Sequence, residues 1–490
     1  MKKQLLFVLT ILVIFSMVIT GCGQKATPEP TQAPATEPPA QPTEPPAPAE
    51  KVQIRWFVGL GTGTDPAQIE VEQALVDKFN AEHDNIELVL EVVPFDSAKD
   101  TLATQIASGQ GPDVIGPVGW GGSNAFYGQW LDLSPYLSGF DASTIDPALV
   151  EMYSDEEQGQ LGLPFLVFPA SLWYIPALFE EAGLNNPPTE WGGKYTMADG
   201  TEVPWDYATL AEVAKMLTID ANGNNALSAD FDKNTIVQYG FHPTWSGHPA
   251  YLGAYQGTPA FFTGTAGNYA SAIPDSWKAA WQWYYDGIWG DQPFIPNAAV
   301  AGSPEFGSGN AFNGGKVAMT MTNLWYTCCL ADFAAAGKEF QFAAIPVGGD
   351  GMPHGRVDAD TFRLWKGTQH PAEAFEVLSY LIGPIGTEYL VVSGTTGTNA
   401  AYGGFPALPE YQQPFLDAKS AQYPFVTTWD VILGGLAYPD VPSAEGYQPN
   451  WNEAWARMQT FGDLMGNTAG LDLATEIATL QNDLTVIYNK

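Results

Sequence analysis

Hydrophobic and polar residues alternate along the chain in patterns that predict strands and helices in turn. Residues 52–58 alternate with the period of a strand, and Ile69, Leu75 and Phe79 have the spacing of an amphipathic helix. The pattern then predicts a strand over 86–93, a helix over 98–107 and a short buried strand over 113–115. Strands that alternate with helices in this way imply parallel pairing, with the helices packed on the faces of the sheet.

The rest of the chain continues this mixture, with no repeat of fixed period and no domain-scale linker. Helices are predicted over 207–217, 275–285, 371–381 and 471–488, and a strand over 317–321. Roughly 440 of the 490 residues follow the N-terminal region, which is more than one core usually organises. The sequence therefore predicts an α/β protein with two lobes built from an interleaved chain.

The N-terminal segment has the pattern of an export signal. Lys2 and Lys3 precede an almost wholly apolar run over 5–19, and small residues then lead into Cys22. This pattern is typical of a signal peptide rather than of a transmembrane helix. The run resembles a bacterial lipobox, which implies a signal peptide over 1–21 and lipidation of Cys22. The alternative is an ordinary signal peptide that contains a cysteine.

The segment that follows, residues 22–50, lacks the side chains that build a core. Between Thr27 and Glu50 only Thr, Pro, Glu, Gln and Ala occur. Proline-rich segments of this kind favour extended polyproline II, so we expect a tether between the lipid anchor and the folded body. A proline-rich recognition segment is the weaker alternative, because the flanking basic residues that such docking often uses are missing.

The charge of the chain narrows the class of partner. Acidic residues number 54 and basic residues 19, which gives a formal net charge of −35, while aromatic residues make up 13%. A field of this sign repels phosphate backbones and anionic lipid, so we expect no nucleic acid and no membrane contact other than the lipid anchor. We expect a monomer that binds a neutral or cationic small molecule.

No catalytic or nucleotide-binding motif is complete. The glycine-rich runs 59–64 and 310–317 depart from the dinucleotide fingerprint and from the P-loop, and neither G-x-S-x-G nor H-E-x-x-H occurs. The first run still precedes a helix, so its backbone N–H groups are expected to be free for ligand hydroxyls. We therefore expect no enzyme. A secreted glycosidase stays open as an alternative, because distances in space decide whether two carboxylates form a pair.

Cysteine and oxygen-ligand patterns support two minor hypotheses. Cys22, Cys328 and Cys329 are the three cysteines, too few for a disulfide framework or a zinc site. We interpret the adjacent pair as reduced core thiols, with a vicinal disulfide as the alternative. Oxygen side chains gather in one loop, where an Asx-type turn is favoured over a structural Ca²⁺ and no other cofactor is expected. The candidate Ca²⁺ ligands are Asp220, Asn222, Asn224, Asp230 and Asp232.

Aromatic residues beside Gly, Pro, Ser or Thr mark candidate ligand-contacting loops. For any single ring, core packing is the commoner role. Together, loop-borne rings on a chain poor in charge indicate faces for sugar C–H surfaces, with Asp, Asn and Thr side chains binding the hydroxyls. These rings belong to Trp120, Phe165, Phe168, Trp173, Trp245, Trp325, Tyr326 and Trp451.

Four short motifs occur in a fixed order over most of the chain after the tether. Residues 107–115 are similar to A-x-G-x-x-PDV, and residues 162–188 to GLP…LF-x-x-AGL-x-x-PP. Residues 312–325 are similar to F-x-x-GK-x-AM…W, and residues 364–374 to I-x-KGTKHP-E-A. In this order the motifs resemble the family 1 extracellular solute-binding proteins of ABC importers, the maltose-binding-protein-like group.

The resemblance implies a periplasmic-binding-protein-like α/β fold of two lobes with an interleaved chain and a ligand cleft between the lobes. Such a protein captures a mono- or oligosaccharide by hinge closure and delivers it to an ABC permease from the outer side of the bacterial cell membrane. A polyamine or a peptide is the alternative solute. The first lobe would comprise residues 51–165 and about 355–385, and the second residues 166–354 and 386–490.

The resemblance also implies where the ligand lies. Trp245, Trp325 and Trp451 are expected to stack on sugar rings, and a disulfide close after Trp325 would shape the pocket floor. The sequence departs from the family pattern at residues 175–176, where the family usually has Asn-Lys, and at residues 358–360, where glycines are common. These departures concern the identity of the ligand rather than the binding role. Asp65 and Asp360 are expected to accept hydrogen bonds from the hydroxyl groups of the sugar. The ligand contacts that the resemblance implies by position are Thr62, Thr64, Asp65, Trp120, Phe168, His242, Trp245, Trp325, Asp360 and Trp451.

Overall fold

Parallel strands and their helices begin the fold, as the hydrophobic pattern predicts. In the computed structural model, β1 (Val52–Val58) pairs in parallel with β2 (Ile86–Val92) and with β3 (Val114–Val118). The connecting helices are α2 (Pro66–Glu82) and α3 (Phe95–Ala107). Helix α2 buries Val71, Leu75, Val76 and Phe79 along one face, which is the amphipathic stripe expected of a helix that covers a sheet.

The structure describes residues 51–490 except 141–144, 146, 156, 258–259, 394–401 and 441–442. The predicted signal peptide, Cys22 and the tether lie outside the described residues. Residues 50–490 form the unit to which all of the following applies.

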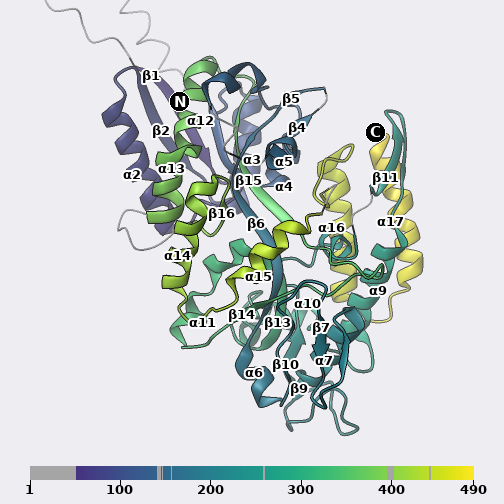
Figure 1. Cartoon of the computed structure of the whole chain (residues 1–490). Coiled ribbons are helices and arrows are strands. Elements are labelled where there is room, and N and C mark those ends of the chain that lie inside the picture. The colour runs from purple at the N-terminus through teal and green to yellow at the C-terminus, as the bar shows by residue number, and fades with distance from the viewer. Residues whose placement is uncertain are drawn as a thin grey trace, which may run out of the picture. The chain divides into compact units, whose positions relative to one another are not determined.

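Two long strands carry the sheet from one lobe to the other. Ten of the described strands form a mixed sheet. Eight of them follow the order β2-β1-β3-β15-β6-β13-β10-β9, with β10 at Ile236–Phe241 and β9 at Ile219–Asp220, while β14 and β16 (Phe405–Pro406) pair with β6 outside this order. All twelve residues of β6 (Leu163–Tyr174) are buried. The first half of β6 pairs with β15 (Val357–Leu364), and its second half pairs with β13 (Val317–Asn323) and β14 (Gln341–Ala343). Figure 1 shows β6 running between the two groups of elements.

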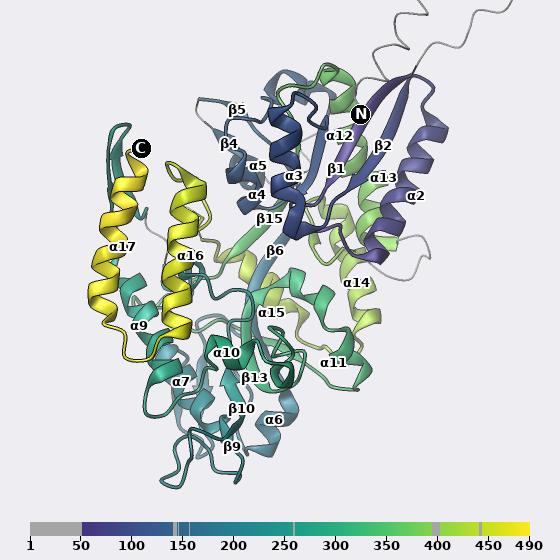
Figure 2. The same cartoon turned by 180° about the vertical axis from the view of Figure 1, so that it is seen from behind.

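The buried hydrophobic residues form two main cores. One contains Trp56, Phe79 and Phe375 around β1 to β3 and extends to Phe342 on β14, whereas the other contains Trp277 and Phe461 around the later helices. Figures 1 and 2 both place α2 and α12 (Pro371–Ile382) near β1 and β2, and α7 (Tyr207–Met216) and α9 (Asp275–Trp289) in the other lobe. The molecule is thus a two-lobe α/β protein, and the expected fold class is confirmed.

The other elements complete the two lobes. The helices are α4 (Trp120–Ala125), α5 (Pro147–Glu151), α6 (Pro176–Glu181), α7 (Tyr207–Met216), α8 (Pro249–Ala254), α9 (Asp275–Trp289), α10 (Ala298–Ala301), α11 (Ala331–Ala335), α12 (Pro371–Ile382), α13 (Pro384–Thr387), α14 (Gln412–Gln422), α15 (Trp429–Gly434), α16 (Trp451–Asn467) and α17 (Leu473–Tyr488). The shorter helical turns are η1 (Ser134–Gly139), η3 (Pro304–Phe306), η4 (Leu324–Cys329), η5 (Glu388–Ser393), η6 (Pro409–Tyr411) and η7 (Gly435–Ala437). The remaining strands are β4 (Ser154–Asp155), β5 (Gly159–Gln160), β7 (Lys194–Thr196), β8 (Glu202–Pro204), β9 (Ile219–Asp220), β10 (Ile236–Phe241), β11 (Phe262–Thr265), β12 (Asn268–Ser271) and β16 (Phe405–Pro406).

The segment after α12 packs beside the first part of the chain. Leu390, Val391, Phe405 and Phe415 share the core of Phe79. The turn η5 packs on α2 because its apolar side chains need a buried surface. The same core also contains Phe342 of β14, so it does not divide the lobes, and the expected lobe boundaries stay predictions.

One part of this region has the apolar character of a membrane segment by length and composition alone. Among the described residues, no single helix is long and apolar enough to span a membrane, and only the bent pair Pro371–Ile382 and Pro384–Val392 meets the criterion jointly. Helix α12 buries Phe375, Leu378 and Leu381 in the core.

Candidate functional site

Arg356, the residue immediately before β15, is the centre of a buried polar network. It is 1% exposed. It donates hydrogen bonds to Asp358 Oδ1 at 2.7 Å, to Glu445 Oε2 at 3.2 Å and to Asn323 Oδ1 at 3.3 Å. Its guanidinium also lies 3.8 Å from the ring centroid of Tyr251. A buried cation requires this many partners because the desolvation of a charge is costly.

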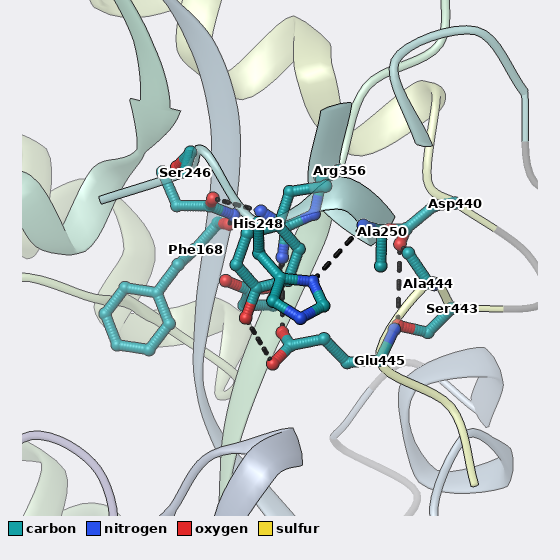
Figure 3. Close-up of polar contacts among 12 residues, drawn as sticks. Phe168, Ser246, His248, Ala250, Arg356, Asp440, Ser443, Ala444 and Glu445 are labelled. Atoms are coloured by element: carbon teal, nitrogen blue, oxygen red, sulfur yellow. Dashed lines mark hydrogen bonds and ion pairs between the residues drawn. The ribbon is translucent and has the colours of Figure 1, made fainter. Parts of the chain in front are cut away.

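The segment 440–447 joins this network to three other elements (Figure 3). Glu445 accepts a hydrogen bond from the Tyr251 hydroxyl at 2.7 Å, and its backbone carbonyl accepts one from the Asn124 side chain in α4. Asp440 accepts hydrogen bonds from the Val357 N–H at 3.0 Å and from the Ala444 N–H at 2.9 Å. Burial raises the pKa of Asp440 to about 6. The segment thus ties α4 of the first lobe and α8 of the second to the crossing strand β15.

Two backbone N–H groups of the glycine turn before α2 have acceptors within the protein. The Thr62 N–H donates to Asp360 Oδ2 at 3.0 Å, and the Gly63 N–H donates to the Gln68 side chain at 2.9 Å. Asp360 is 6% exposed, and burial raises its pKa to about 7. The expectation that these N–H groups are free for ligand hydroxyls is therefore wrong. Asp65 is exposed and precedes the first turn of α2.

A pocket of about 300 Å³ opens beside the network. From the first lobe it is lined by Trp120, Tyr127, Tyr153 and Asp155, among others, and from the segment 440–447 by Asp440, Ser443, Gly446 and Tyr447. Trp120 stacks on Tyr153 with ring centroids 4.6 Å apart and an interplanar angle of 28°.

A pair of stacked tyrosines forms part of the lining of this pocket. Tyr127 and Tyr447 stack with centroids 3.8 Å apart and an angle of 20°. The Tyr127 hydroxyl donates to Asp155 Oδ2 at 2.7 Å, which orients both groups. Tyr447 is 42% exposed. The pocket therefore combines ring faces with carboxylate oxygens.

A second aromatic surface lies on the loop before α8 and on η4. Trp245 stacks on Trp325 with centroids 6.2 Å apart and an angle of 25°, and Tyr326 meets Trp245 edge-on at 5.7 Å. Trp245 is 50% exposed and has a left-handed backbone with φ of 58°. This conformation is an outlier for a bulky residue and points to a functional constraint. The neighbouring Ser246 anchors the loop by donating to Thr322 Oγ1 at 3.2 Å.

Two of the predicted stacking residues do not present a free face. Trp451 is 3% exposed and stacks on Trp455 at 5.2 Å, and Trp455 in turn stacks on His248 at 3.8 Å. Phe168 is 2% exposed in the core, and Figure 3 shows its ring pointing away from Arg356. The expectation that Phe168 and Trp451 offer a ring face to the ligand does not agree with this structure, because both rings are buried against other side chains.

The other predicted contacts occupy intermediate surroundings. Thr62 and Thr64 are half-buried in the glycine turn, and Thr62 Oγ1 accepts a hydrogen bond from Gln68 at 3.0 Å. His242 is half-buried, with Nδ1 3.3 Å from Thr244 Oγ1, and burial lowers its pKa to about 4. The imidazole of His242 is therefore neutral at neutral pH.

Comparison with known proteins identifies the architecture. The family model of the bacterial extracellular solute-binding proteins matches residues 64–388, which is more than half of the chain. The chain belongs to this family. A member of the family binds a solute on the outer side of the cell membrane, so the protein is extracytoplasmic and a binding protein.

Individual relatives agree with the family. A binding protein of Brucella abortus (strain 2308) is 25% identical over 345 residues, which cover 68% of this chain and 72% of the relative. An ABC substrate-binding protein from Listeria monocytogenes, solved in complex with cycloalternan, has a TM-score of 0.65 and 18% identity over 89% of this chain and 99% of that one. The cyclic alpha-maltosyl-1,6-maltose binding protein from Arthrobacter globiformis has a TM-score of 0.62 and 17% identity over 90% and 100% of the two chains. The two solved structures share the fold with this solute-binding protein.

Several residues of the site were not foreseen from the sequence. Arg356, Tyr251 and Glu445 form the polar network, and Tyr127 and Tyr447 stack in the lining of the pocket. A local signal for part of the network exists at residues 356–360. Charged residues at alternate positions of an otherwise apolar strand share one face, and a buried charged face has to meet partners.

The two minor hypotheses have different outcomes. Cys328 and Cys329 are joined in a disulfide, and Cys328 is exposed, so the interpretation as reduced core thiols is wrong. Asp220 accepts the N–H groups of Asn222, Asn224 and Asp232, each at 2.9 Å, as in an Asx-type turn. These hydrogen bonds, that from Asp232 foremost, lower the pKa of Asp220 to about 2. Within the described ranges, no group of three or more His, Cys, Asp or Glu side chains is placed to hold a metal ion.

Proposed function

We propose that this solute-binding protein captures a neutral mono- or oligosaccharide between its lobes and delivers it to an ABC permease. The observation that carries the proposal is the pocket in which Trp120 stacks on Tyr153 beside Asp155 and Asp440. Sugar rings present C–H faces that pack on aromatic rings, and their hydroxyls require oxygen acceptors. Sugar ligands in the solved relatives, such as cycloalternan and mannotriose, support the same class.

Closure of the lobes provides the mechanism of capture. The crossing strands β6 and β15 connect the lobes, and the segment 440–447 contacts α4, α8 and β15. A ligand that contacts both lobes binds the closed form more tightly than the open form and so shifts the population toward closure. The protein releases its ligand unchanged, because its role is transport.

The cellular placement forms part of this proposal. Residues 1–21 would be removed, Cys22 would carry the lipid, and residues 22–50 would hold a monomeric body away from the membrane. Replacement of Cys22 by serine is expected to release the protein from the membrane fraction into the soluble fraction. Retention of the variant in the membrane would contradict lipid anchoring.

The central test is a thermal-shift and calorimetry screen against neutral mono- and oligosaccharides, with a polyamine and a peptide as comparison ligands. A carbohydrate is expected to raise the melting temperature by mass action. Its affinity is expected to stay constant between ~0.05 and ~0.5 M salt, because a neutral ligand is not screened. A polyamine that binds with steep salt dependence would contradict the proposal, and hydrolysis of the sugar would indicate a glycosidase.

A pair of variants links binding to the pocket. Trp120→Ala is expected to weaken carbohydrate binding by about tenfold, which is ~1.4 kcal/mol. Phe95→Ala is the matched control, since Phe95 is 56% exposed at the start of α3 and does not line the pocket. Equal affinities of the two variants, measured by calorimetry, would remove Trp120 from the ligand site.

A further inference from the structure

The turn η4 carries a half-buried tryptophan and an exposed disulfide cysteine that lie on one face. Trp325 is its second residue, and the disulfide between Cys328 and Cys329 closes its end. In a 3₁₀-helix the side chains at positions i and i+3 eclipse each other. Trp325 and Cys328 have this spacing, so the disulfide adjoins Trp325 on the side of the helix that carries the aromatic surface.

The opposite face of η4 is fastened to the protein. Tyr326 and Thr327 are buried, and the Tyr326 hydroxyl donates to the Asn310 side chain. The Tyr423 hydroxyl donates to the Thr327 carbonyl at 2.9 Å, and the Asn310 side chain donates to the Cys329 carbonyl at 2.9 Å. Cys328 is exposed, whereas Trp325 is half-buried and packs in part against the core.

The surface of η4 continues onto the loop before α8. Trp245 stacks on Trp325, and it is held there by a left-handed backbone although half of the residue is exposed. Trp245, Trp325 and the disulfide therefore form one accessible apolar surface of two indole rings and a sulfur pair. Sulfur is polarizable and packs well against aromatic rings and C–H groups.

We propose that the Cys328–Cys329 disulfide is part of the ligand-binding surface and that its reduction by a dithiol weakens carbohydrate binding. The role rests on the proposed function, because it concerns the surface that would contact the sugar. The disulfide restrains two neighbouring side chains before the ligand arrives, and an ordered surface loses less conformational freedom on binding. Reduction breaks the bond between the two sulfur atoms, so the side chains of Cys328 and Cys329 regain conformational freedom at the end of η4.

The reduction is a thiol–disulfide exchange. A thiolate of the dithiol attacks the exposed Cys328 sulfur, and Cys329 leaves as a thiolate that takes up a proton. The second thiol of the reagent then attacks the mixed disulfide and frees the Cys328 thiol. In total, two electrons and two protons pass to the protein, and the dithiol becomes a cyclic disulfide. An extracytoplasmic location favours the oxidised form before such treatment.

The experiment compares the oxidised and reduced forms of the full chain. Mannotriose, cycloalternan, maltotriose and cellotriose serve as probes, and dithiothreitol is the reductant. Mass spectrometry after alkylation counts the thiols of the peptide that contains Cys328 and Cys329, which should be zero before and two after treatment. Calorimetry is expected to show that reduction lowers the affinity for the probe that binds by about fivefold, and that reoxidation restores this affinity.

Variants separate the disulfide from other effects of the reductant. Cys328→Ser/Cys329→Ser is expected to bind with the affinity of the reduced protein whether or not dithiothreitol is present. Cys22→Ser is the control and is expected to respond to dithiothreitol as the wild type does. If the double variant does not fold, reversible reduction and reoxidation of the folded wild type still measure the effect.

Three outcomes would overturn this role. Two free thiols in the untreated protein would show that the disulfide is absent, and unchanged affinity after complete reduction would show that it does not contribute. Either result leaves carbohydrate binding itself intact. Failure of the oxidised protein to bind any of the four probes would count against the proposed function and against this role together.

Discussion

Two groups of stacked rings in this protein differ in exposure although the sequence predicts the same role for both. Trp245 and Trp325 stack at an angle of 25° with Trp245 half exposed, whereas Trp451 and Trp455 stack at 12° with Trp451 3% exposed. Trp451 and Trp455 are one turn apart on α16, and Trp455 continues onto His248 at the start of α8.

The difference comes from the backbone that carries the rings. The stack of Trp451, Trp455 and His248 sits on two helices that pack against each other, so each ring face is covered by the next. Trp245 lies on a loop in a left-handed conformation, which exposes its ring while Trp325 supports it. A ring on packed helices therefore stabilises the fold, and a ring on a constrained loop remains accessible to a ligand.

The largest expected effect comes from truncating the buried stack. Trp451→Ala is expected to lower the free energy of unfolding by about 3–5 kcal/mol, because it leaves a cavity beside Trp455. Urea unfolding monitored by circular dichroism measures this loss, and Trp451→Phe should lose less. If Trp451→Ala kept its stability but lost affinity, Trp451 would belong with the accessible rings.

Arg356 lies between the stack of Trp451 and Trp455 and the pair of Trp245 and Trp325, so its replacement tests whether the stability of the fold depends on the buried network that links them. Its guanidinium lies on Tyr251 beside Trp455 and donates to Asn323, which immediately precedes η4. Arg356→Gln is expected to cost about 3 kcal/mol of unfolding free energy, since Asp358 and Glu445 lose a buried cation.

An arginine with a more exposed partner provides the control for this loss. Arg457 pairs with Asp483 at 2.8 Å, and the Asp483 side chain is 46% exposed. Arg457→Gln is expected to cost less than about 1 kcal/mol in the same urea experiment, because solvent screens such pairs. Equal losses in the two variants would contradict a special role for the buried network.

The accessible pair should respond in affinity rather than in stability. Trp325→Ala is expected to weaken carbohydrate binding by about tenfold, or ~1.4 kcal/mol, because a stacking face is lost. Calorimetry measures the affinity, and Trp325→Phe should retain part of it. Unchanged affinity at full occupancy would show that this surface does not meet the ligand.

The smallest effect concerns the acid stability of the buried stack. Burial lowers the pKa of His248 to about 3 from the usual 6.5, and His248 Nδ1 accepts the Ala250 N–H at 3.2 Å. Below pH 6.5 the unfolded chain binds a proton that the folded protein excludes, so the contribution of His248 to stability falls as the pH falls toward 3. Between about pH 7.5 and 5.5 this contribution is expected to fall by ~1 kcal/mol, whereas buried carboxyl groups such as Asp360 contribute with the opposite sign.

The variant His248→Phe isolates this contribution. It keeps a ring on Trp455 but has no group that titrates, so its unfolding free energy should fall less between about pH 7.5 and 5.5 than that of the wild type. Denaturant unfolding at the two pH values gives the difference. If the unfolding free energies of the two proteins depended on pH in the same way, His248 would not contribute to the pH dependence, and the claim that the folded protein excludes its proton would be contradicted.

Much of the fold was predictable from local patterns, and one central strand was not. The strands and helices over 52–115 follow from hydrophobic periodicity, and so do α7, α9, α12, α17 and β13. Strand β6 contains Pro164 and Pro169, which argue against a central strand. The sheet tolerates them in part through an irregular register between Asp360 and Thr361, opposite Leu166 and Pro164.

The candidate site was predictable only in part, for a different reason. The glycine turn looked like a set of free donors, yet Asp360 and Gln68 accept its N–H groups. Asp360 lies 298 residues from Thr62, and no local pattern shows that the two meet. Phe168 likewise looks like a loop residue beside Pro169, but β6 places it in the core.

From its sequence alone, this protein could be assigned an order of strands and helices, a parallel beginning of the sheet and a family resemblance. These features depend on backbone geometry and on spacings of a few residues, which a sequence displays directly. Only the tertiary structure decided which rings are accessible and which charges are neutralised. Those properties depend on contacts such as Arg356 with Glu445, 89 residues apart, where burial and hydrogen bonding act between segments that the chain order does not bring together.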